Sequence, residues 1–194
     1  MKTVTGLFDT HADAVSAVRD LESMGIPSDD ISIVSHHGEG EDSNAAEGAG
    51  TGAGIGAAVG GAGGLLAGLG IMAIPGVGPV VAAGWLASTA AGAIAGAVAG
   101  GAAGGIIGAM TDDGVPEADA HVYAEGVRRG GSLVTARVND AREAEATAIL
   151  RRGTWVDPME RRRAYEAEGW SAFDENLPPY TTEEIDRERG RYRV

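Results

Sequence analysis

The feature that most constrains this chain is an uncharged stretch of 64 residues, from Gly48 to Thr111. Within it, glycine recurs at every fourth position in two series, and only Ser88 interrupts the second. On a helix of 3.6 residues per turn, a four-residue step keeps these glycines along one slowly drifting face, so each series predicts a helix with a stripe free of side chains. The predicted helix-packing residues are Gly48, Gly52, Gly56, Gly60, Gly64, Gly68, Gly84, Gly92, Gly96, Gly100, Gly104 and Gly108.

Two prolines and two glycines separate the two series. Pro75, Gly76, Gly78 and Pro79 break any helix and favour a tight reversal of the chain. The stretch 48–111 is therefore predicted to be a glycine-zipper helical hairpin with its turn at these four residues.

The energetic cost of glycine limits where such a hairpin is stable. Each helix-interior glycine costs about 1 kcal/mol relative to alanine, so the glycines of the two arms imply a deficit on the order of 15 kcal/mol or more in water. A lipid bilayer enforces helix and allows close packing of small residues, and burial against other copies of the chain offers a second solution. Arms 48–72 and 79–110 both exceed the roughly 20 residues needed to cross the hydrocarbon core, which favours a two-pass membrane hairpin. The most lipophilic part, Leu65–Leu86, is centred on the turn, so shallow insertion stays an alternative.

Charge and composition exclude several classes of protein. The formal net charge is −13, which argues against a nucleic-acid partner because phosphate binding relies on clustered Lys and Arg. The chain contains no cysteine, so disulfides and thiolate chemistry are excluded. The first 13 residues lack both a basic start and an apolar core, so no signal peptide is expected and both termini are predicted to be cytoplasmic.

The segment before the hairpin predicts a β-α-β unit. Val4–Phe8 is a short strand, Thr10 and Asp13 form a capping box, and the helix that follows buries Ala14, Ala17, Val18, Leu21 and Met24. Ile31–Val34 is the second strand, and an acidic linker occupies 36–47.

The segment after the hairpin resembles a second copy of this unit. An offset of 130 residues places Val134 on Val4, Asp140 on Thr10 and Glu143 on Asp13. A last short strand is predicted at Trp155–Val156. The predicted fold class is therefore α+β: a ferredoxin-like β-α-β-β-α-β domain, formed by 1–35 and 130–156, that is interrupted by the hairpin and by one extra helix at 112–129.

The remaining residues, 157–194, predict a polar, helical or extended C-terminal tail. Thr181 and Glu184 form a capping box for a last charged helix. We expect this tail to dock on the domain or on an unknown partner.

Several motifs resemble a known family. Thr5–Asp9, Gly25–Pro27, the turn Ile74–Pro79 and the segment from Gly114 to Val134 resemble the bacterial general stress and low-temperature-induced proteins that carry a YflT-like domain. The resemblance covers roughly residues 3 to 156. It implies a stress-linked, membrane-associated protein without an assigned catalytic activity, and it offers no catalytic residues to carry over.

Motifs that invite a chemical function are weak. Gly52–Ala57 fits a dinucleotide-binding spacing, but no strand precedes it directly and no acidic residue follows at the required distance. His36 and His37, beside Glu39, Glu41 and Asp42, are more typical of a solvated linker than of a metal site. No G-x-S-x-G elbow exposes a nucleophile, and Arg161–Arg163 favours a salt-bridged helix surface over lipid contact. No cofactor, metal site or catalytic residue is therefore predicted.

The leading hypothesis is a non-enzymatic stress-response protein of the inner membrane. A cytoplasmic ferredoxin-like domain would be anchored to the bilayer and self-associated, as a homo-oligomer, through the two-pass hairpin. Two alternatives stay open: a soluble cytoplasmic homo-oligomer whose hairpins form a buried bundle, and a ferredoxin-like module that senses a small ligand.

Overall fold

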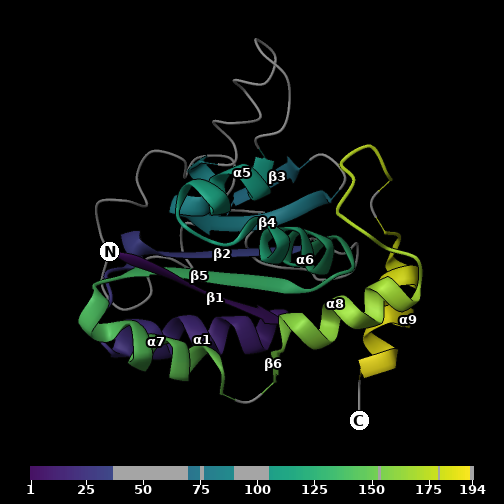
Figure 1. Ribbon diagram of the computed structural model, residues 1–194. Coiled ribbons are helices and arrows are strands. Elements are labelled where there is room, and N and C mark those ends of the chain that lie inside the picture. Colours follow the sequence, from purple (N-terminus) through teal and green to yellow (C-terminus); the bar gives the residue numbers. More distant parts are fainter. Residues whose placement is uncertain (37–69, 75–76, 90–104, 153, 179, 193–194) are drawn as a thin grey trace.

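The computed structural model describes residues 1–36, 70–74, 77–89, 105–152, 154–178 and 180–192. They form an α+β structure built on one six-stranded antiparallel sheet, with the strand order β3-β4-β2-β5-β1-β6 (Figure 1). The predicted acidic linker 36–47 falls outside these residues apart from His36.

The N-terminal unit has the elements that the sequence predicts. Strand β1 (Lys2–Phe8) leads into α1 (His11–Ser23), a short 3₁₀ turn η1 (Ser28–Asp30) and strand β2 (Ile31–His36). The hydroxyl of Thr10 accepts a hydrogen bond from the Asp13 backbone N–H at 3.2 Å, which confirms the capping box. The predicted inward face of the helix is also confirmed, apart from the partly buried Met24: its buried residues are Ala14, Ala17, Val18 and Leu21.

The second unit repeats this order with a different start to its helix. Strand β5 (Ser132–Val138) is followed by η3 (Asp140–Arg142), α7 (Glu143–Leu150) and the two-residue strand β6 (Trp155–Val156). The prediction that Asp140 caps an α-helix is wrong, because residues 140–142 form a 3₁₀ turn and no side chain caps α7. The predicted strands at 132–138 and 155–156 are confirmed.

Strand β5 lies at the centre of the sheet and pairs with both strands of the first unit. It runs antiparallel to β1, with Thr5 opposite Thr135, and antiparallel to β2, with Ile33 opposite Val134. Strand β6 adds to the free edge of β1, where Leu7 lies opposite Val156. The four strands of the two units are therefore interleaved in space in the order β2-β5-β1-β6.

The predicted helical hairpin is wrong around its turn. Residues that were assigned to the two helical arms form strands β3 (Gly70–Ile74) and β4 (Gly78–Gly84), which pair antiparallel with Ile74 opposite Gly78. A reversal does occur at the predicted place, but it joins strands. The physical reason is that this part of the stretch is rich in β-branched side chains, and the free edge of β2 offers backbone partners, with Ile33 opposite Ala83.

The prediction of a two-pass membrane anchor is also wrong. Among the residues that the structure describes, no helix combines the length and the apolar character needed to cross a bilayer. Residues 79–84, which the second arm needed, belong to the sheet, and the described end of that arm is the eight-residue helix α5 (Gly105–Asp112). The inner-membrane location rested on this anchor and loses that support.

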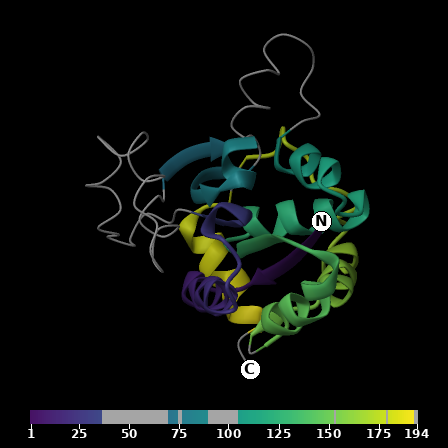
Figure 2. The same cartoon turned by 90° about the vertical axis from the view of Figure 1, so that its left-hand side faces the viewer.

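Helices cover both faces of the sheet (Figures 1 and 2). On one face, α1 and α7 pack on a core that includes Val18, Ile33 and Val134. On the opposite face, α5 and α6 (Glu117–Arg128) pack on a second core that includes Leu7 and Leu133. The single extra helix expected at 112–129 is thus α6, and it shares its face of the sheet with α5.

An arginine on β5 connects the sheet to the segments around it. The guanidinium group of Arg137 lies 3.8 Å from the centroid of the Trp85 ring and forms a 2.7 Å ion pair with Asp113. Trp85 is 7% exposed, so it packs within its own domain.

The C-terminal tail folds back onto the domain as helices α8 (Pro158–Ala167) and α9 (Thr182–Tyr192). The predicted capping box at the start of α9 is confirmed, because the Thr181 N–H donates to Glu184 at 2.8 Å and the Glu184 N–H donates to the Thr181 hydroxyl at 3.4 Å. In Figure 1, α8 and α9 lie beside one another at the end of the sheet where β6 sits. The tail is therefore an integral wall of this end of the molecule.

Candidate ligand-binding cleft

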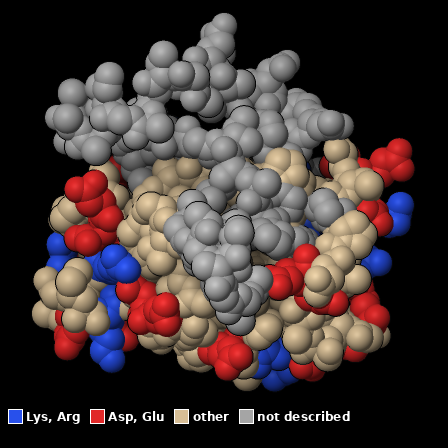
Figure 3. All heavy atoms as spheres, turned by 90° about the horizontal axis from the view of Figure 1, so that it is seen from above, with Lys and Arg blue, Asp and Glu red and all other residues tan. Residues whose placement is uncertain are grey.

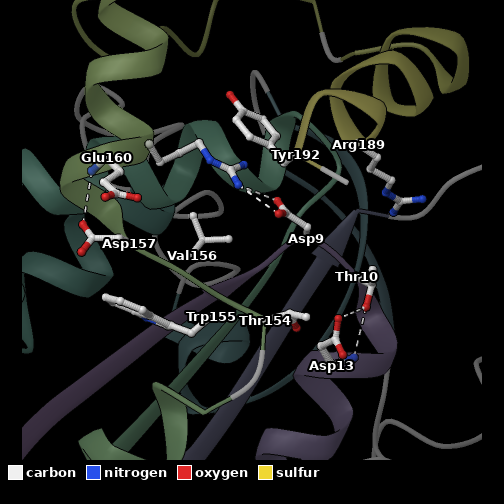
Figure 4. A pocket seen from close by; sticks show the side chains of 11 residues that line it. Asp9, Thr10, Asp13, Thr154, Trp155, Val156, Asp157, Glu160, Arg189 and Tyr192 are labelled. Carbon is white, nitrogen blue, oxygen red and sulfur yellow. Dashed lines mark hydrogen bonds and ion pairs between the residues drawn. The ribbon is translucent and has the colours of Figure 1, made fainter. Parts of the chain in front are cut away.

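A cleft of about 530 Å³ lies where the start of α1, strand β6, the start of α8 and the end of α9 meet (Figure 4). In Figure 4, Asp157 and Glu160 lie on one side and Thr10 and Asp13 on the other, with Val156 between them. Its lining residues are Asp9, Thr10, Asp13, Thr154, Trp155, Val156, Asp157, Glu160, Arg161, Arg189 and Tyr192.

Two helix starts form opposite walls of the cleft. At α1, the Thr10 hydroxyl donates to the Asp13 carboxylate at 2.6 Å while it caps the helix. At α8, Asp157 accepts hydrogen bonds from the backbone N–H groups of Met159 and Glu160 at 2.8 and 3.2 Å. Both caps satisfy N–H groups that have no partner within the helix, so these side chains are held in fixed positions by the backbone.

The end of α9 closes a third side of the cleft. Arg161 of α8 is buried, forms a 2.8 Å ion pair with Asp9, and places its guanidinium 3.7 Å from the centroid of the Tyr192 ring. Burial raises the pKa of the Tyr192 hydroxyl, so this residue presents a neutral phenol at neutral pH. Arg189 uses one N–H group to donate to the carbonyl of Gly130 at 2.9 Å.

The cleft carries more negative charge than its own cations neutralise. The lining holds four carboxylates, on Asp9, Asp13, Asp157 and Glu160, and two guanidinium groups, on Arg161 and Arg189, and Arg161 pairs with Asp9. In the described part of the chain, no ion pair involves Asp13, Asp157 or Glu160. Because charges that line a concave, low-dielectric wall focus the field into it, the potential in this cleft favours cations.

The aromatic rings of the cleft already contact cations from the protein itself. The Trp155 ring lies 5.0 Å from the Arg151 guanidinium, and the Tyr192 ring lies 3.7 Å from that of Arg161. The negative face of an aromatic ring attracts such groups, more strongly when water is excluded. The walls therefore combine the two kinds of group that recognise organic cations, namely carboxylates and aromatic rings.

A buried charge network supports α9 from behind the cleft. Glu125 of α6 is fully buried and accepts hydrogen bonds from Arg128 at 2.7 Å and from Arg129 at 2.7 Å. Arg129 also donates to Glu168 at 2.8 Å and to Glu188 of α9 at 3.1 Å. Every buried charge in this group has a partner of opposite sign, which is the condition for burying charge at a tolerable cost.

Aromatic rings complete the surroundings of the network. The Arg129 guanidinium lies 4.0 Å from the centroid of the Tyr165 ring and 5.5 Å from that of Tyr180. Burial raises the pKa of the Tyr165 hydroxyl well above its ordinary value, so the ring beside Arg129 is neutral. The segment between α8 and α9 is thereby fixed to α6 by both charge and aromatic contact.

Most of the predicted helix-packing glycines lie outside the described residues. Those placed are Gly84, which ends β4, and Gly108, which lies within α5; Gly78 and Pro79 of the predicted turn begin β4, and Pro75 and Gly76 lie outside. Gly84 has a φ of +88°, and a Cβ there would lie 2.1 Å from the Ile31 carbonyl oxygen. Glycine at position 84 allows two strands to approach closely, so the predicted role of Gly84 in helix packing is wrong.

The other motifs singled out from the sequence do not meet at the cleft. His36 is a buried residue of β2, whereas His37 and the acidic residues after it, like Gly52–Ala57, lie outside the described residues. No group of three or more His, Asp or Glu residues is arranged to hold a metal ion in the part that the structure describes. Arg161 and Arg162 form ion pairs with Asp9 and Asp119, which confirms salt bridges for two of the three arginines. The partners lie on other segments and Arg161 is buried, so the prediction of a salt-bridged helix surface is confirmed only in part.

Sequence reasoning missed the cleft. The signals available were the two acid-containing helix starts, at Thr10 and Asp157, because side chains at a helix start are well fixed. Nothing local indicates that these starts face each other across β6.

The comparison with known families concerns the first unit. Residues 3–72 match the heat-induced stress protein YflT domain. The YflT match includes β1, α1, β2 and the first residues of β3, and it confirms the resemblance over this part. It ends before the turn and before the segment from Gly114 to Val134, where the resemblance stays a prediction. No curated protein and no solved structure matches the chain.

Proposed function

We propose that this chain is a non-enzymatic stress-response protein whose ferredoxin-like domain binds a small organic cation in the cleft between α1, β6, α8 and α9. The YflT match supports the link to stress. The strand order β2-β5-β1-β6 supports the ferredoxin-like assignment, because it is the order of a β-α-β-β-α-β domain with an insertion between its second and third strands.

One observation carries the proposal. The cleft of about 530 Å³ is large enough for a small molecule, and its walls hold three carboxylates, on Asp13, Asp157 and Glu160, without a cationic partner in the described part of the chain. The aromatic rings of Trp155 and Tyr192 border the same space. A ligand with an ammonium or guanidinium group satisfies both features.

The side chains of the cleft support binding over catalysis. The Thr10 hydroxyl caps α1 and Asp157 Oδ1 caps α8, so these two atoms fix the walls, and Oδ2 of Asp157 is the oxygen left for a ligand. The charges at the surface seen from above are mixed: in Figure 3, acidic side chains interleave with basic ones around the described part of that face.

The test is a binding screen on the intact chain by thermal shift, followed by calorimetry. The probes are putrescine, spermidine, agmatine and choline as organic cations, Mg²⁺ as an inorganic cation, and phosphate and glutamate as anions. We expect at least one organic cation to raise the melting temperature and the anions to leave it unchanged. Stabilisation by an anion, or by none of the organic cations, would refute the proposal.

A matched pair of variants locates the binding. Glu160 lines the cleft, whereas Glu166 lies on the same helix, is exposed and does not line it. Because a partly exposed ion pair contributes about 0.2–1 kcal/mol, Glu160→Gln should raise the Kd of the bound cation by about 1.4- to fivefold and Glu166→Gln should leave it unchanged. Equal losses in the two variants would place the binding elsewhere.

A further inference from the structure

We infer that α9 is a reversible wall of the cleft, so that detachment of this helix opens the cleft and a bound ligand holds the helix in place. The second half of this inference rests on the proposed function, and the first half does not. Helix α9 contributes Arg189 and Tyr192 to the lining, so the cleft is complete only when the helix is docked.

The contacts that hold α9 are mainly polar. Its buried residues are Ile185 and Glu188, so a single apolar side chain is buried by the helix in the described part. The other contacts are Glu188 to Arg129, Arg191 to Glu168, Arg189 to the Gly130 carbonyl, and Tyr192 against Arg161. Segments with little buried apolar surface are those that open locally without unfolding of the whole domain.

The buried charged groups of the domain keep partners of opposite charge when α9 detaches. Arg129 keeps its 2.7 Å contact with Glu125 of α6 and its 2.8 Å contact with Glu168, and Arg161 keeps its pair with Asp9. Detachment therefore leaves no buried charge without a partner on the domain side. Such an unpaired buried charge is the usual reason that breaking a buried ion pair is costly. Glu188 moves into water together with Arg191, its partner at 3.1 Å.

The connection to the domain keeps the detached helix close. The segment before α9 is held by the Phe173 N–H, which donates to His121 at 3.2 Å, and by the Pro178 carbonyl, which accepts from Arg128 at 3.4 Å. A short tether gives a high effective concentration, so redocking is favoured. A cleft cation that contacts Tyr192 binds the docked state better and, by linkage, shifts the helix toward it.

The chain contains no native cysteine, so an introduced cysteine is the single thiol that a maleimide can label. In the intact chain, Val156→Cys places a single thiol on a buried, cleft-lining position of β6. The maleimide labelling rate of this thiol reports opening of the cleft, while hydrogen exchange of α9 amides reports detachment and exchange of β5 amides reports global unfolding. Glu188→Gln weakens the contact with Arg129; Asp186→Asn, an exposed position of the same helix, is the matched control.

We expect Glu188→Gln, combined with Val156→Cys, to raise α9 exchange and labelling of the introduced thiol together, by about tenfold, without a change in β5, because a hydrogen bond to a charged group is weakened. Asp186→Asn should change none of the three. Ile185→Ala, a second variant, should act like Glu188→Gln. If α9 exchanges only as slowly as β5, or if its exchange rises while labelling of the thiol does not, the helix is not a reversible wall.

An experiment with added ligand distinguishes the proposed ligand class from the proposed detachment of α9. Spermidine is added to the chain without the introduced thiol, and α9 exchange is measured again; an effect of about tenfold slower exchange is expected when the probe is present at ten times its Kd. If spermidine and the other organic cations fail to bind while the labelling results hold, the ligand class is wrong and the reversible wall stands. If a cation binds but α9 exchange does not slow, the coupling is refuted.

Discussion

Ile185 fills the space that a side chain on Gly130 would need. A Cβ at Gly130 would lie 2.2 Å from Cγ2 of Ile185, and Gly130 has a φ of +94° just after α6. The end of α6 and the first turn of α9 thus meet at a point where only hydrogen fits.

This contact predicts that Gly130→Ala releases α9. Alanine at a positive φ costs about 1–2 kcal/mol in backbone strain alone, and here the clash with Ile185 is added. Gly114→Ala is the control, because Gly114 has a φ of +91° but nothing within 4 Å of its added Cβ. Both variants should lose unfolding free energy in chemical denaturation, but only Gly130→Ala should speed hydrogen exchange in α9. Equal exchange in the two variants would show that Ile185 yields without moving the helix.

Loss of the Glu125 carboxylate should destabilise the whole domain. Glu125→Ala leaves Arg128 and Arg129 without the anion that both contact, and breaking a buried ion pair in this way costs about 3–5 kcal/mol. Glu117→Ala, at an exposed position of the same helix, should cost less than about 1 kcal/mol. Urea denaturation of both variants measures the difference. A loss below about 1 kcal/mol for Glu125→Ala would mean that Glu168 and Glu188 compensate for the missing charge.

Acid should weaken the docking of α9 below about pH 4.5. The hydrogen bond from Arg129, helped by the charges of Arg129 and Arg191, holds the pKa of Glu168 below its ordinary value of 4.5, although burial opposes this shift. A lowered carboxyl pKa contributes stability that is present above the unfolded value and is lost as the pH falls through the folded one. NMR shifts of α9 amides should therefore change in this acidic range.

The Glu168→Gln variant isolates that effect. It removes the titrating group, so the part of the acid-induced change that stems from Glu168 should disappear, while Glu166→Gln, which alters an exposed neighbour, should keep it. An unchanged titration in Glu168→Gln would assign the transition to other carboxyl groups.

The strand assignment of 78–84 predicts a severe effect at Gly84. A Cβ there would meet the backbone of Ile31 and Ser32 at 2.1 and 2.7 Å, and backbone atoms cannot move aside as side chains do. Gly84→Ala should therefore lower the unfolding free energy by more than Gly114→Ala, whose cost is backbone strain alone, about 1–2 kcal/mol. Comparison of the two by thermal denaturation tests the β-hairpin directly. A Gly84→Ala variant as stable as Gly114→Ala would favour a helical arm in this region.

Local sequence signals predicted most of the two β-α-β units. The capping pair of Thr10 and Asp13 located α1, and the 130-residue offset from Val4 to Val134 located β5, because both depend on residues close in sequence or on direct repetition. The β-hairpin that ends at Gly84 was wrongly predicted to be helical, because the four-residue glycine spacing is a helix signal. The pairing of β4 with the free edge of β2 has no signal in the local sequence. The cleft could not be predicted for the same reason: Asp9, Asp157 and Tyr192 come from three distant segments.

The central position of β5 has a consequence for how the protein is made. Strands β1 and β2 are synthesised before β5, yet neither pairs with the other, and each needs β5 as its neighbour. The YflT-matching residues 3–72 therefore contain two strands that must wait for Ser132–Val138 before their sheet can close. Since long-range pairing slows folding, the apolar faces of β1 and β2 stay without their neighbouring strand until β5 is synthesised.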